Sequence, residues 1–254
     1  MTRVIKVGGR PQSDPALPAA VAAGWDRANG GVVLVHGGGD EVSALQEAFG
    51  VATTFVDGRR VTTAEDVDLV RMALSGSANK RLVSSLVASG IDAVGLSGED
   101  AALIAATPMD ATRLGHVGVP GRVNVAFLRH LLSGGYLPVI SPVSRDGSGE
   151  LGGALNVNGD DAAAAIAVAL GAAELLLVAD VEGVLRAGRV VPRLTPTEAR
   201  RLLADGTAVG GMHAKLQAAL RAIEGGVARV RISDVAAIGD SDRGTTIQNF
   251  GDFS

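Results

Sequence analysis

Short runs of branched apolar residues recur along the whole 254-residue chain, and this pattern constrains the fold more than any other feature. Such runs stand at residues 4–7, 32–35, 93–96, 137–140, 175–178 and 227–232. Each has the length of a buried β-strand. Between them lie alanine- and leucine-rich stretches of helical length, at residues 42–49, 64–74, 80–88, 125–132, 162–170 and 214–223. The alternation predicts an α/β protein in which a mainly parallel sheet lies between two layers of helices, a three-layer αβα sandwich.

The composition argues against several classes of site and partner. The chain has no cysteine, which excludes disulfides, thiolate zinc sites and a cysteine nucleophile. It carries 27 acidic and 23 basic residues, and a net charge of -4 does not favour nucleic acid. No apolar stretch approaches the roughly 18 residues of a membrane span. The first residues contain Arg3 and Lys6 and run into a glycine turn, which leaves no room for a signal peptide. We therefore expect a cytoplasmic protein with neither nucleic-acid nor membrane partners.

Two regions look more polar and less regular than the rest, residues 53–63 and 107–124. We interpret the first as a hairpin that covers a site, because Asp57-Gly58 can form a tight turn between its two arms. The second has no assigned structure.

Two glycine-rich turns follow the first two predicted strands. The first strand ends in Lys6-Val7-Gly8-Gly9, and the second ends in His36-Gly37-Gly38-Gly39-Asp40 before a helix. Paired glycines allow the backbone close to a ligand, and exposed N–H groups at a helix start favour an anion. Each turn taken alone could be an ordinary strand-to-helix connection. Neither matches a P-loop or the G-x-G-x-x-G fingerprint, so a phosphate site here has another architecture.

Two later segments carry polar side chains beside predicted helices. Asn156 and Asn158 alternate in an extended segment before Asp160, so both amides can point to one side. A turn with a helix cap would explain Asn158 or Asp160 without any ligand. Further on, the Gly210-Gly211 turn places Lys215 in the first turn of a predicted helix, where the helix dipole disfavours a cation. The alternative for Lys215 is a solvated surface side chain.

Taken together, these segments resemble the amino acid kinase family over nearly the whole chain, and most closely its members that phosphorylate N-acetylglutamate. One such match is weak, whereas the ordered set is specific. The chain departs from the family at Gly159, where alanine is more frequent, and in the short connection 186–189. The matching motifs are Lys6-Val7-Gly8-Gly9, Val35-His36-Gly37-Gly38-Gly39, Gly58-Arg59-Arg60-Val61-Thr62, Gly76-Ser77-Ala78-Asn79-Lys80, Gly95-Leu96-Ser97-Gly98, Leu114-Gly115-His116-Val117-Gly118, Asn156-Val157-Asn158-Gly159-Asp160, Asp180-Val181-Glu182-Gly183-Val184, Gly210-Gly211-Met212-His213-Ala214-Lys215 and Gly244-Thr245.

The resemblance implies transfer of the γ-phosphoryl group of ATP to the side-chain carboxylate of N-acetyl-L-glutamate, a step of arginine biosynthesis. It implies that Lys6 and Lys215 contact the phosphoryl oxygens and that Asp160 orients both lysines. Arg60 and Asn156 would hold the acetylamino acid, with Arg60 on its α-carboxylate. Backbone N–H groups would bind at two loops, Gly37 with Gly38 on the substrate side and Gly8 with Gly9 on the nucleotide side. The remaining nucleotide contacts would come from Asp180, Val181, Glu182, Gly183, Val184, Thr207, Ala208 and Val209.

The chain shows no linker that would separate autonomous domains, and its best division is a soft one near Gly152-Gly153. The resemblance then assigns residues 1–153 to the amino-acid substrate, the covering hairpin and a dimer surface, and residues 154–254 to ATP, on one continuous sheet. No dense acidic cluster indicates a protein metal site, so we expect Mg2+ to arrive with ATP. The arginine-inhibited hexamers of the family carry an additional N-terminal helix that this sequence does not show. A homodimer is therefore the expected assembly.

The chemistry of a carboxylate acceptor agrees with these residues. The acceptor is already ionised at neutral pH, so no general base is required and none of the four histidines is assigned as a catalyst.

Two rival functions keep part of the pattern. A kinase acting on N-acetyl-α-aminoadipate, or on aminoadipate or glutamate linked to a carrier protein, would retain all of these residues. A noncatalytic sensor of nucleotide or amino acid would not require Lys6, Asp160 and Lys215 together.

Overall fold

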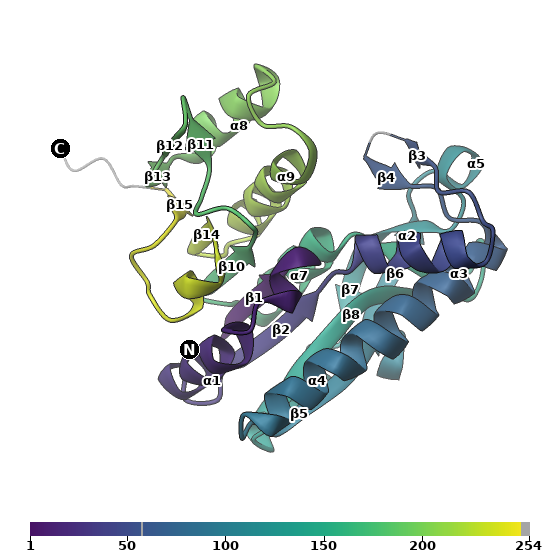
Figure 1. Ribbon diagram of the computed structural model, residues 1–254, viewed down its shortest axis with the longest axis horizontal. Helices are drawn as coiled ribbons and strands as arrows, with labels where there is room; N and C mark the ends of the chain where they lie inside the picture. The colour runs from purple at the N-terminus through teal and green to yellow at the C-terminus, as the bar shows by residue number, and fades with distance from the viewer. Residues whose placement is uncertain (57, 250–254) are drawn as a thin grey trace.

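The centre of the molecule is a parallel sheet. The computed structural model describes residues 1–56 and 58–249. Parallel strands lie in the order β14, β10, β1, β2, β8 and β5 (Figure 1). All of them coincide with apolar runs of the sequence, so the predicted α/β fold with a mainly parallel sheet is confirmed. Their bounds are β1 Arg3–Val7, β2 Val32–His36, β5 Ala93–Gly98, β8 Leu137–Asp146, β10 Glu174–Val178 and β14 Arg229–Ser233.

Strands that the apolar pattern did not predict extend the sheet at both flanks. β15 (Thr245–Ile247) runs antiparallel to β14 and parallel to β13 (Arg193–Leu194). At the other flank β6 (Ile104–Pro108), β7 (Val117–Val123) and β9 (Ala154–Val157) form a mixed arrangement with β8. β7 lies inside the segment 107–124, so the expectation of irregular structure is wrong there. Glycines and a proline interrupt its apolar pattern, and pairing with two neighbours supplies the order that the pattern lacks.

The expected covering hairpin is present and short. β3 (Phe55–Val56) and β4 (Arg59–Arg60) pair with each other in antiparallel fashion. The expected turn residue Asp57 lies outside the described residues. The two strands form a sheet of their own, and the hairpin is attached to the rest of the molecule by side-chain contacts of Arg59 and Arg60 and by backbone hydrogen bonds of Thr62 with residues 114 and 116. A second small hairpin joins β11 (Leu185–Arg186) and β12 (Arg189–Val190).

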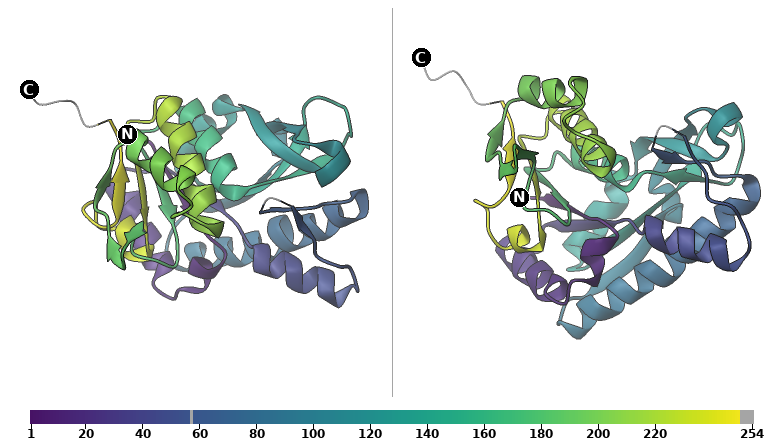
Figure 2. Two further views of the ribbon diagram at one scale, coloured as in Figure 1. Left: turned by 90° about the horizontal axis from the view of Figure 1, so that it is seen from above. Right: turned by 45° about the horizontal axis from the view of Figure 1, so that its top comes forward.

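Helices cover both faces of the main sheet (Figure 2), which confirms the three-layer arrangement. α1 and α4 pack on one face against Ile5, Val7 and Leu34. α6, α7, α8 and α9 pack on the other face, where they meet Val4 and Val33. Neighbouring residues of a strand point to opposite faces, so the central strands are buried on both sides. The bounds are α1 Leu17–Arg27, α4 Asn79–Ala88, α6 Val125–Ser133, α7 Gly159–Leu170, α8 Pro196–Ala204 and α9 Gly210–Glu224.

α3 (Ala64–Arg71), a π-helical stretch (Met72–Ala78) and α4 form one continuous helical segment. α2 (Gly39–Ala48) packs beside it, and α5 (Ala111–Leu114) is a single turn. Short 3-10 segments occupy Arg10–Ser13, Asp100–Ala102 and Val235–Ile238. Within the described part of the chain, no helix is both long and apolar enough to cross a membrane.

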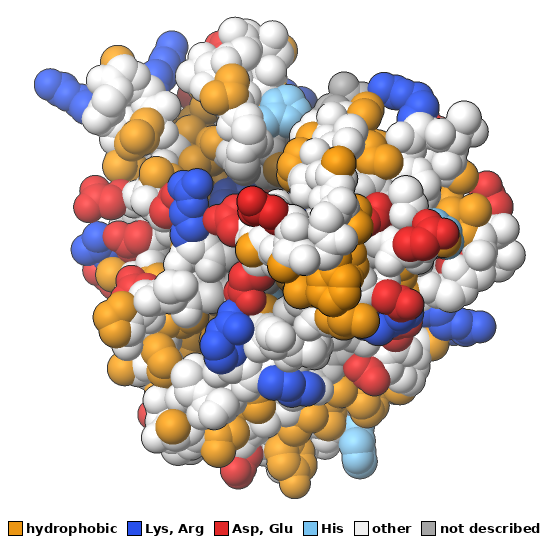
Figure 3. Space-filling model, turned by 45° about the vertical axis from the view of Figure 1, so that its right-hand side comes forward, with side chains coloured by type: hydrophobic (Ala, Val, Ile, Leu, Met, Phe, Trp, Pro, Cys, Tyr) orange, Lys and Arg blue, Asp and Glu red, His pale blue; other side chains and the backbone are white. Residues whose placement is uncertain are grey.

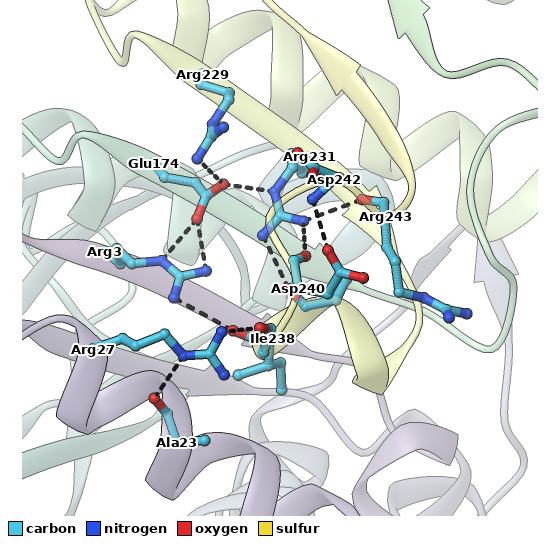
Figure 4. A network of polar contacts seen from close by, with 12 residues as sticks. Arg3, Ala23, Arg27, Glu174, Arg229, Arg231, Ile238, Asp240, Asp242 and Arg243 are labelled. Carbon is cyan, nitrogen blue, oxygen red and sulfur yellow. Dashed lines mark hydrogen bonds and ion pairs between the residues drawn. The ribbon is translucent and has the colours of Figure 1, made fainter.

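Arginines gather around one buried carboxylate at the start of β10 (Figure 4). Glu174 is 3% exposed and accepts hydrogen bonds from Arg3 at 2.7 Å and from Arg231 at 2.6 Å. Arg229 Nη2 lies 3.0 Å from the same carboxylate. Arg231 is fully buried, and its other N–H groups donate to backbone carbonyls of the segment 237–243. The network ties three central strands to the segment that leads into β15.

Replacement Glu174→Ala should lower the free energy of unfolding by about 3 kcal/mol, because a buried guanidinium then loses its charged partner. Glu224→Ala is the matched control, since Glu224 and its partner Arg200 are each more than half exposed. Loss of that exposed pair should cost less than about 1 kcal/mol. Urea titration of both variants measures the difference. Similar small losses in the two variants would show that the Glu174 network does not stabilise the fold.

Candidate active site

The carboxyl ends of β1 and β2 bring the two glycine-rich turns together. Ligands of α/β sheets bind beyond this edge. Val7 and His36 are partners in the parallel register, and a Cβ on Gly9 would lie 3.5 Å from the Cα of Gly38. Gly38 has a φ of 148°, and a Cβ there would come within 2.8 Å of Leu74, so glycine is required at this position.

The N–H groups of the two turns have different tasks. Gly8 donates to the Val178 carbonyl at 3.2 Å and Gly37 donates to the Val7 carbonyl at 3.0 Å, so these two N–H groups serve the sheet. Gly9, Gly38 and Gly39 follow them and line the cavities described below. The loop donors best placed for a ligand therefore belong to these later glycines.

His36 fixes the second turn from inside. The ring is buried, which lowers the pKa of His36 to about 4 and keeps it neutral at pH 7. Its Nδ1 lies 2.9 Å from the Gly37 carbonyl, and its Nε2 lies 3.1 Å from the amide nitrogen of Asn79. A neutral ring that carries its proton on Nδ1 satisfies both contacts. His36 thus has a structural task in the loop.

Two cavities meet at Lys6. The first has a volume of about 500 Å3 and lies among α2, the β3–β4 hairpin and the start of α7. The second, of about 450 Å3, extends toward the end of β10 and the start of α9. Their shared lining residues are Lys6, Gly9, Gly39, Asp40 and Gly211. In Figure 3 the surface is hollowed between the two halves of the molecule, and acidic and basic side chains lie around the hollow.

Asp160 lies between the two predicted lysines. Its Oδ1 is 2.9 Å from Lys6 Nζ, and its Oδ2 is 3.2 Å from Lys215 Nζ. The three residues are buried, with exposed fractions of 4% for Asp160, 6% for Lys6 and 9% for Lys215. They come from α7, β1 and α9. The structure therefore brings together three predicted residues from distant parts of the chain.

The charges of this cluster do not balance. Burial alone would raise the pKa of Asp160, but Lys6 and Lys215 outweigh it and hold the pKa at about 2. Burial lowers the pKa of Lys6 below the ordinary 10.5; Asp160 opposes this shift and Lys215 adds to it. One ionised carboxylate faces two lysines, so an anionic ligand between the cavities is favoured.

The start of α7 presents Asp160 to the lysines. Asn158 caps the helix, because its Oδ1 accepts from the N–H groups of Asp160 at 2.8 Å and Asp161 at 3.3 Å. This is the capping alternative that the sequence left open. A Cβ on Gly159 would lie 3.1 Å from Lys6 Cε, so the departure from the family's alanine gives the lysine room.

Lys215 lies in the second turn of α9, and the expectation of the first turn is wrong. The apolar pattern predicted a helix from residue 214, whereas the glycine pair that the pattern assigned to a loop is already helical and α9 begins at Gly210. The buried pairing with Asp160 also excludes the solvated alternative.

Arg60 faces the first cavity from the hairpin. It is 8% exposed, and its guanidinium donates to the Gly39 carbonyl and to Ser43 Oγ, both at 2.8 Å. Gln46 Oε1 accepts a further bond at 2.5 Å, and the ring of Phe55 lies 4.9 Å away. These acceptors are neutral. Within the described residues, no carboxylate bonds directly to the guanidinium, although Asp66 and Asp40 act on its charge from nearby.

Asn156 of β9 faces the same cavity. Its Nδ2 donates to Thr62 Oγ1 at 3.0 Å, and its backbone N–H donates to the His116 carbonyl at 2.8 Å. Val117 and Pro142 supply apolar parts of the lining. The first cavity thus combines amide, guanidinium and apolar contacts.

The structure divides the residues predicted on the nucleotide side. Asp180 and Val181 line the second cavity beside Gly8 and Gly9. Val184 is buried, and its N–H donates to Thr245 Oγ1 at 2.8 Å. The described lining of this cavity does not include Glu182, Gly183, Val184, Thr207, Ala208 or Val209.

Other lining residues escaped the sequence-based prediction. Arg10 lies at the second cavity, with Nη1 3.1 Å from Asp180 and Nε 3.7 Å from Asp40. Ser43 lines the first cavity and Met212 the second. Arg10 could have been found, because it directly follows a glycine turn expected to bind phosphate. Ser43 sits within a helical pattern, Met212 follows a glycine pair that the pattern assigned to a loop, and neither carries such a signal.

Comparison with known proteins gives concordant results. Residues 1–234 match the model of the amino acid kinase family. The acetylglutamate kinase of Chloroflexus aurantiacus is 44% identical over 239 residues, 93% of this chain and 93% of that protein. The acetylglutamate kinase of Rubrobacter xylanophilus is 41% identical and covers 100% of this chain and 99% of its own length. The crystal structure of smu.665 from Streptococcus mutans superposes with a TM-score of 0.87 at 28% identity, over 98% of this chain and 99% of that one.

The lowered pKa of Lys6 can be measured directly, since the chain contains only three lysines, Lys6, Lys80 and Lys215. In protein labelled with 13Cε-lysine, the Lys6 signal should titrate below 10.5. Asp160→Asn should lower this pKa further, because it removes the charge that opposes burial. Lys80→Arg and Lys215→Arg assign the signals by elimination. A Lys6 pKa at or above 10.5, or a rise in Asp160→Asn, would contradict the electrostatic description.

Proposed function

The chain belongs to the amino acid kinase family, and we infer that it transfers the γ-phosphoryl group of ATP to the side-chain carboxylate of N-acetyl-L-glutamate. The products are N-acetyl-L-glutamyl 5-phosphate and ADP, and the step belongs to arginine biosynthesis. Relatives named acetylglutamate kinase, 41% and 44% identical over nearly the full chain, support this function. The structural observation that carries it is the meeting of two cavities at Lys6, with Asp160 and Lys215 beside it.

The electrostatics of the site suit this transfer. A side-chain oxygen of the acceptor forms a bond to the γ-phosphorus, while the bond to the bridging oxygen breaks and its electrons leave with ADP. Both reactants are anions, and the transition state spreads charge over the equatorial phosphoryl oxygens. Preorganised cations and N–H donors in a site with little water stabilise that charge. An uncompensated positive charge between the two cavities meets this requirement.

We assign the catalytic tasks by position. Lys6 lines both cavities and would contact the oxygens of the group in transfer. Lys215 lines the second cavity and would stabilise the leaving side. Asp160 contacts both amines and would hold them in place. The N–H groups of Gly9 and Gly38 would add hydrogen bonds to the phosphoryl group.

The first cavity would receive the acetylamino acid. Arg60 would pair with the α-carboxylate, since its present acceptors are neutral and compete weakly with a carboxylate. Asn156 would contact the acetylamino group. A longer substrate such as N-acetyl-α-aminoadipate would use the same residues, and one methylene changes affinity by only about 1 to 3 kcal/mol. The names of the relatives favour N-acetylglutamate.

The second cavity would receive ATP, with Mg2+ carried by the phosphates. Asp40 and Asp180 border this cavity, and Arg10 lies near both carboxylates. Asp160 is engaged by two lysines. These pairings favour a metal that is held by nucleotide oxygens and water. In this proposal residues 1–153 supply most of the acyl-acceptor lobe and residues 154–254 most of the ATP lobe.

We also propose a cytoplasmic homodimer. β5 pairs with β8 on one side, and no other strand of the described sheet covers its outer side. Its apolar residues at 93–96 are only partly buried, and Val87 of the adjoining α4 is 53% exposed. An apolar edge of this kind is suited to pairing with a second copy.

The substrate assignment is tested with ATP, Mg2+ and either N-acetyl-L-glutamate or N-acetyl-L-α-aminoadipate, trapping the acyl phosphate as a hydroxamate. N-acetylglutamate should give the larger kcat/KM. Equal or better turnover of the aminoadipate derivative would overturn the assignment. Binding of both ligands without hydroxamate formation would favour the noncatalytic sensor.

Variants separate transfer from binding. Lys6→Ala and Lys215→Ala should each lower kcat by about 100-fold or more, because transition-state charge loses a preorganised partner. Arg60→Ala should chiefly raise the KM for the acetylamino acid. Near-normal kcat in both lysine variants would contradict the electrostatic mechanism, and an unchanged KM in Arg60→Ala would remove Arg60 from the substrate site.

A further inference from the structure

Arg59 and Arg60 are neighbours on the hairpin, yet their side chains bond to different elements beside the first cavity. Arg60 bonds to groups at α2, as described above. Arg59 Nη1 donates to Asp161 Oδ2 of α7 at 2.7 Å. Successive side chains of a strand point in opposite directions, which accounts for the division. The hairpin is thus attached both to α2 and to α7.

Asp161 joins the hairpin to a third element. The carboxylate is buried in the first turn of α7, directly after Asp160. Its Oδ2 accepts from Arg59, and its Oδ1 accepts from Arg221 of α9. Each oxygen therefore has its own arginine. The three residues connect the hairpin with the helix that carries Asp160 and the helix that carries Lys215.

The surroundings strengthen the Arg59–Asp161 ion pair. Arg59, Asp161 and Arg221 border a third cavity of about 510 Å3, whose other lining is largely apolar residues of α7 and β7. Arg59 lines this cavity and also the first one, so it stands between the two. The side chain of Asp161 is 6% exposed, and that of Arg59 is 18% exposed. The Arg59–Asp161 pair is therefore screened less than pairs on the open surface, whereas the side chain of Arg221 is 47% exposed.

We propose that Arg59, Asp161 and Arg221 form a positioning triad that holds the hairpin, and with it Arg60, over the acetylamino-acid cavity. The triad touches no reacting atom, and the proposal rests on the proposed function. Lys6, Asp160 and Lys215 are held by separate contacts. Loss of the triad therefore weakens binding of the acetylamino acid while the transfer step is retained.

The test compares steady-state kinetics of the full-length wild type with variants of the triad. Arg59→Met keeps the length of the side chain and removes its charge. It should raise the KM for N-acetylglutamate about tenfold, the effect of losing one charged hydrogen bond, while kcat and the KM for ATP stay within about twofold. Asp161→Asn should act in the same direction. Arg59→Lys keeps the charge and should recover most of the affinity.

Arg71→Met is the matched control. Arg71 is also a partly exposed arginine paired with carboxylates, with two contacts of 3.0 Å to Glu99 and a further ion pair with Asp68, and it is not among the described residues that line the three cavities. Its loss should leave all kinetic constants unchanged, and thermal unfolding of each variant separates binding effects from stability. The double variant Arg59→Met with Asp161→Asn should show no larger KM than the more affected single variant, because both changes remove the Arg59–Asp161 ion pair, and Asp161→Asn alone already weakens the pair with Arg221.

The outcomes distinguish the two levels of the proposal. A folded wild type without turnover would refute the proposed function. An active wild type whose Arg59→Met and Arg59→Lys variants keep the normal KM would refute the triad. The triad would also be refuted if Arg59→Met raised the KM no more than Arg71→Met does. It would be refuted as well if the KM increases of the two single variants multiplied in the double variant.

Discussion

The contact of Asp160 with Lys6 and Lys215 is the interaction on which the rest of the site depends. Each of these groups would be costly to bury alone, because a charge loses its hydration in the protein interior. Together they make direct contacts, the shortest at 2.9 and 3.2 Å, and remain almost inaccessible to water. The requirement brings β1, α7 and α9 to one place. The glycine turns, the cap of α7 and the space that Gly159 leaves for Lys6 all serve this convergence.

The surplus of positive charge explains how one centre can serve two cavities. Arg60 faces the first cavity with neutral acceptors, Arg10 lies at the second with carboxylates near it, and Lys6 lines both. Anions drawn into the two cavities are brought toward the same amine. The hairpin completes the first cavity, and its adjacent arginines divide the work of attachment between α2 and α7.

Much of the framework was predictable because it depends on local patterns. The buried strands of a parallel sheet appear as continuous apolar runs, and β1, β2, β5, β8, β10 and β14 were recognised in this way. β7 was not, because glycine and proline interrupt its pattern and its order comes from pairing with β6 and β9. The start of α9 was misplaced because Gly210-Gly211 is typical of a loop, whereas the structure begins the helix at Gly210. The likeness of ordered motifs indicated the site residues, but it could not tell which loop N–H groups are already used by the sheet.

The sequence by itself determined the fold class, the family and the residue types required for phosphoryl transfer to a carboxylate. These follow from periodicity and from ordered motifs, which can be read along the chain. Only the tertiary structure decided which charges share a partner. Lys6 lies more than a hundred residues before Asp160 in the sequence, and Lys215 lies dozens of residues after it. Arg59, Asp161 and Arg221 are spaced in a similar way. Their pairing depends on distance and burial in three dimensions, and the strength of an ion pair depends on both.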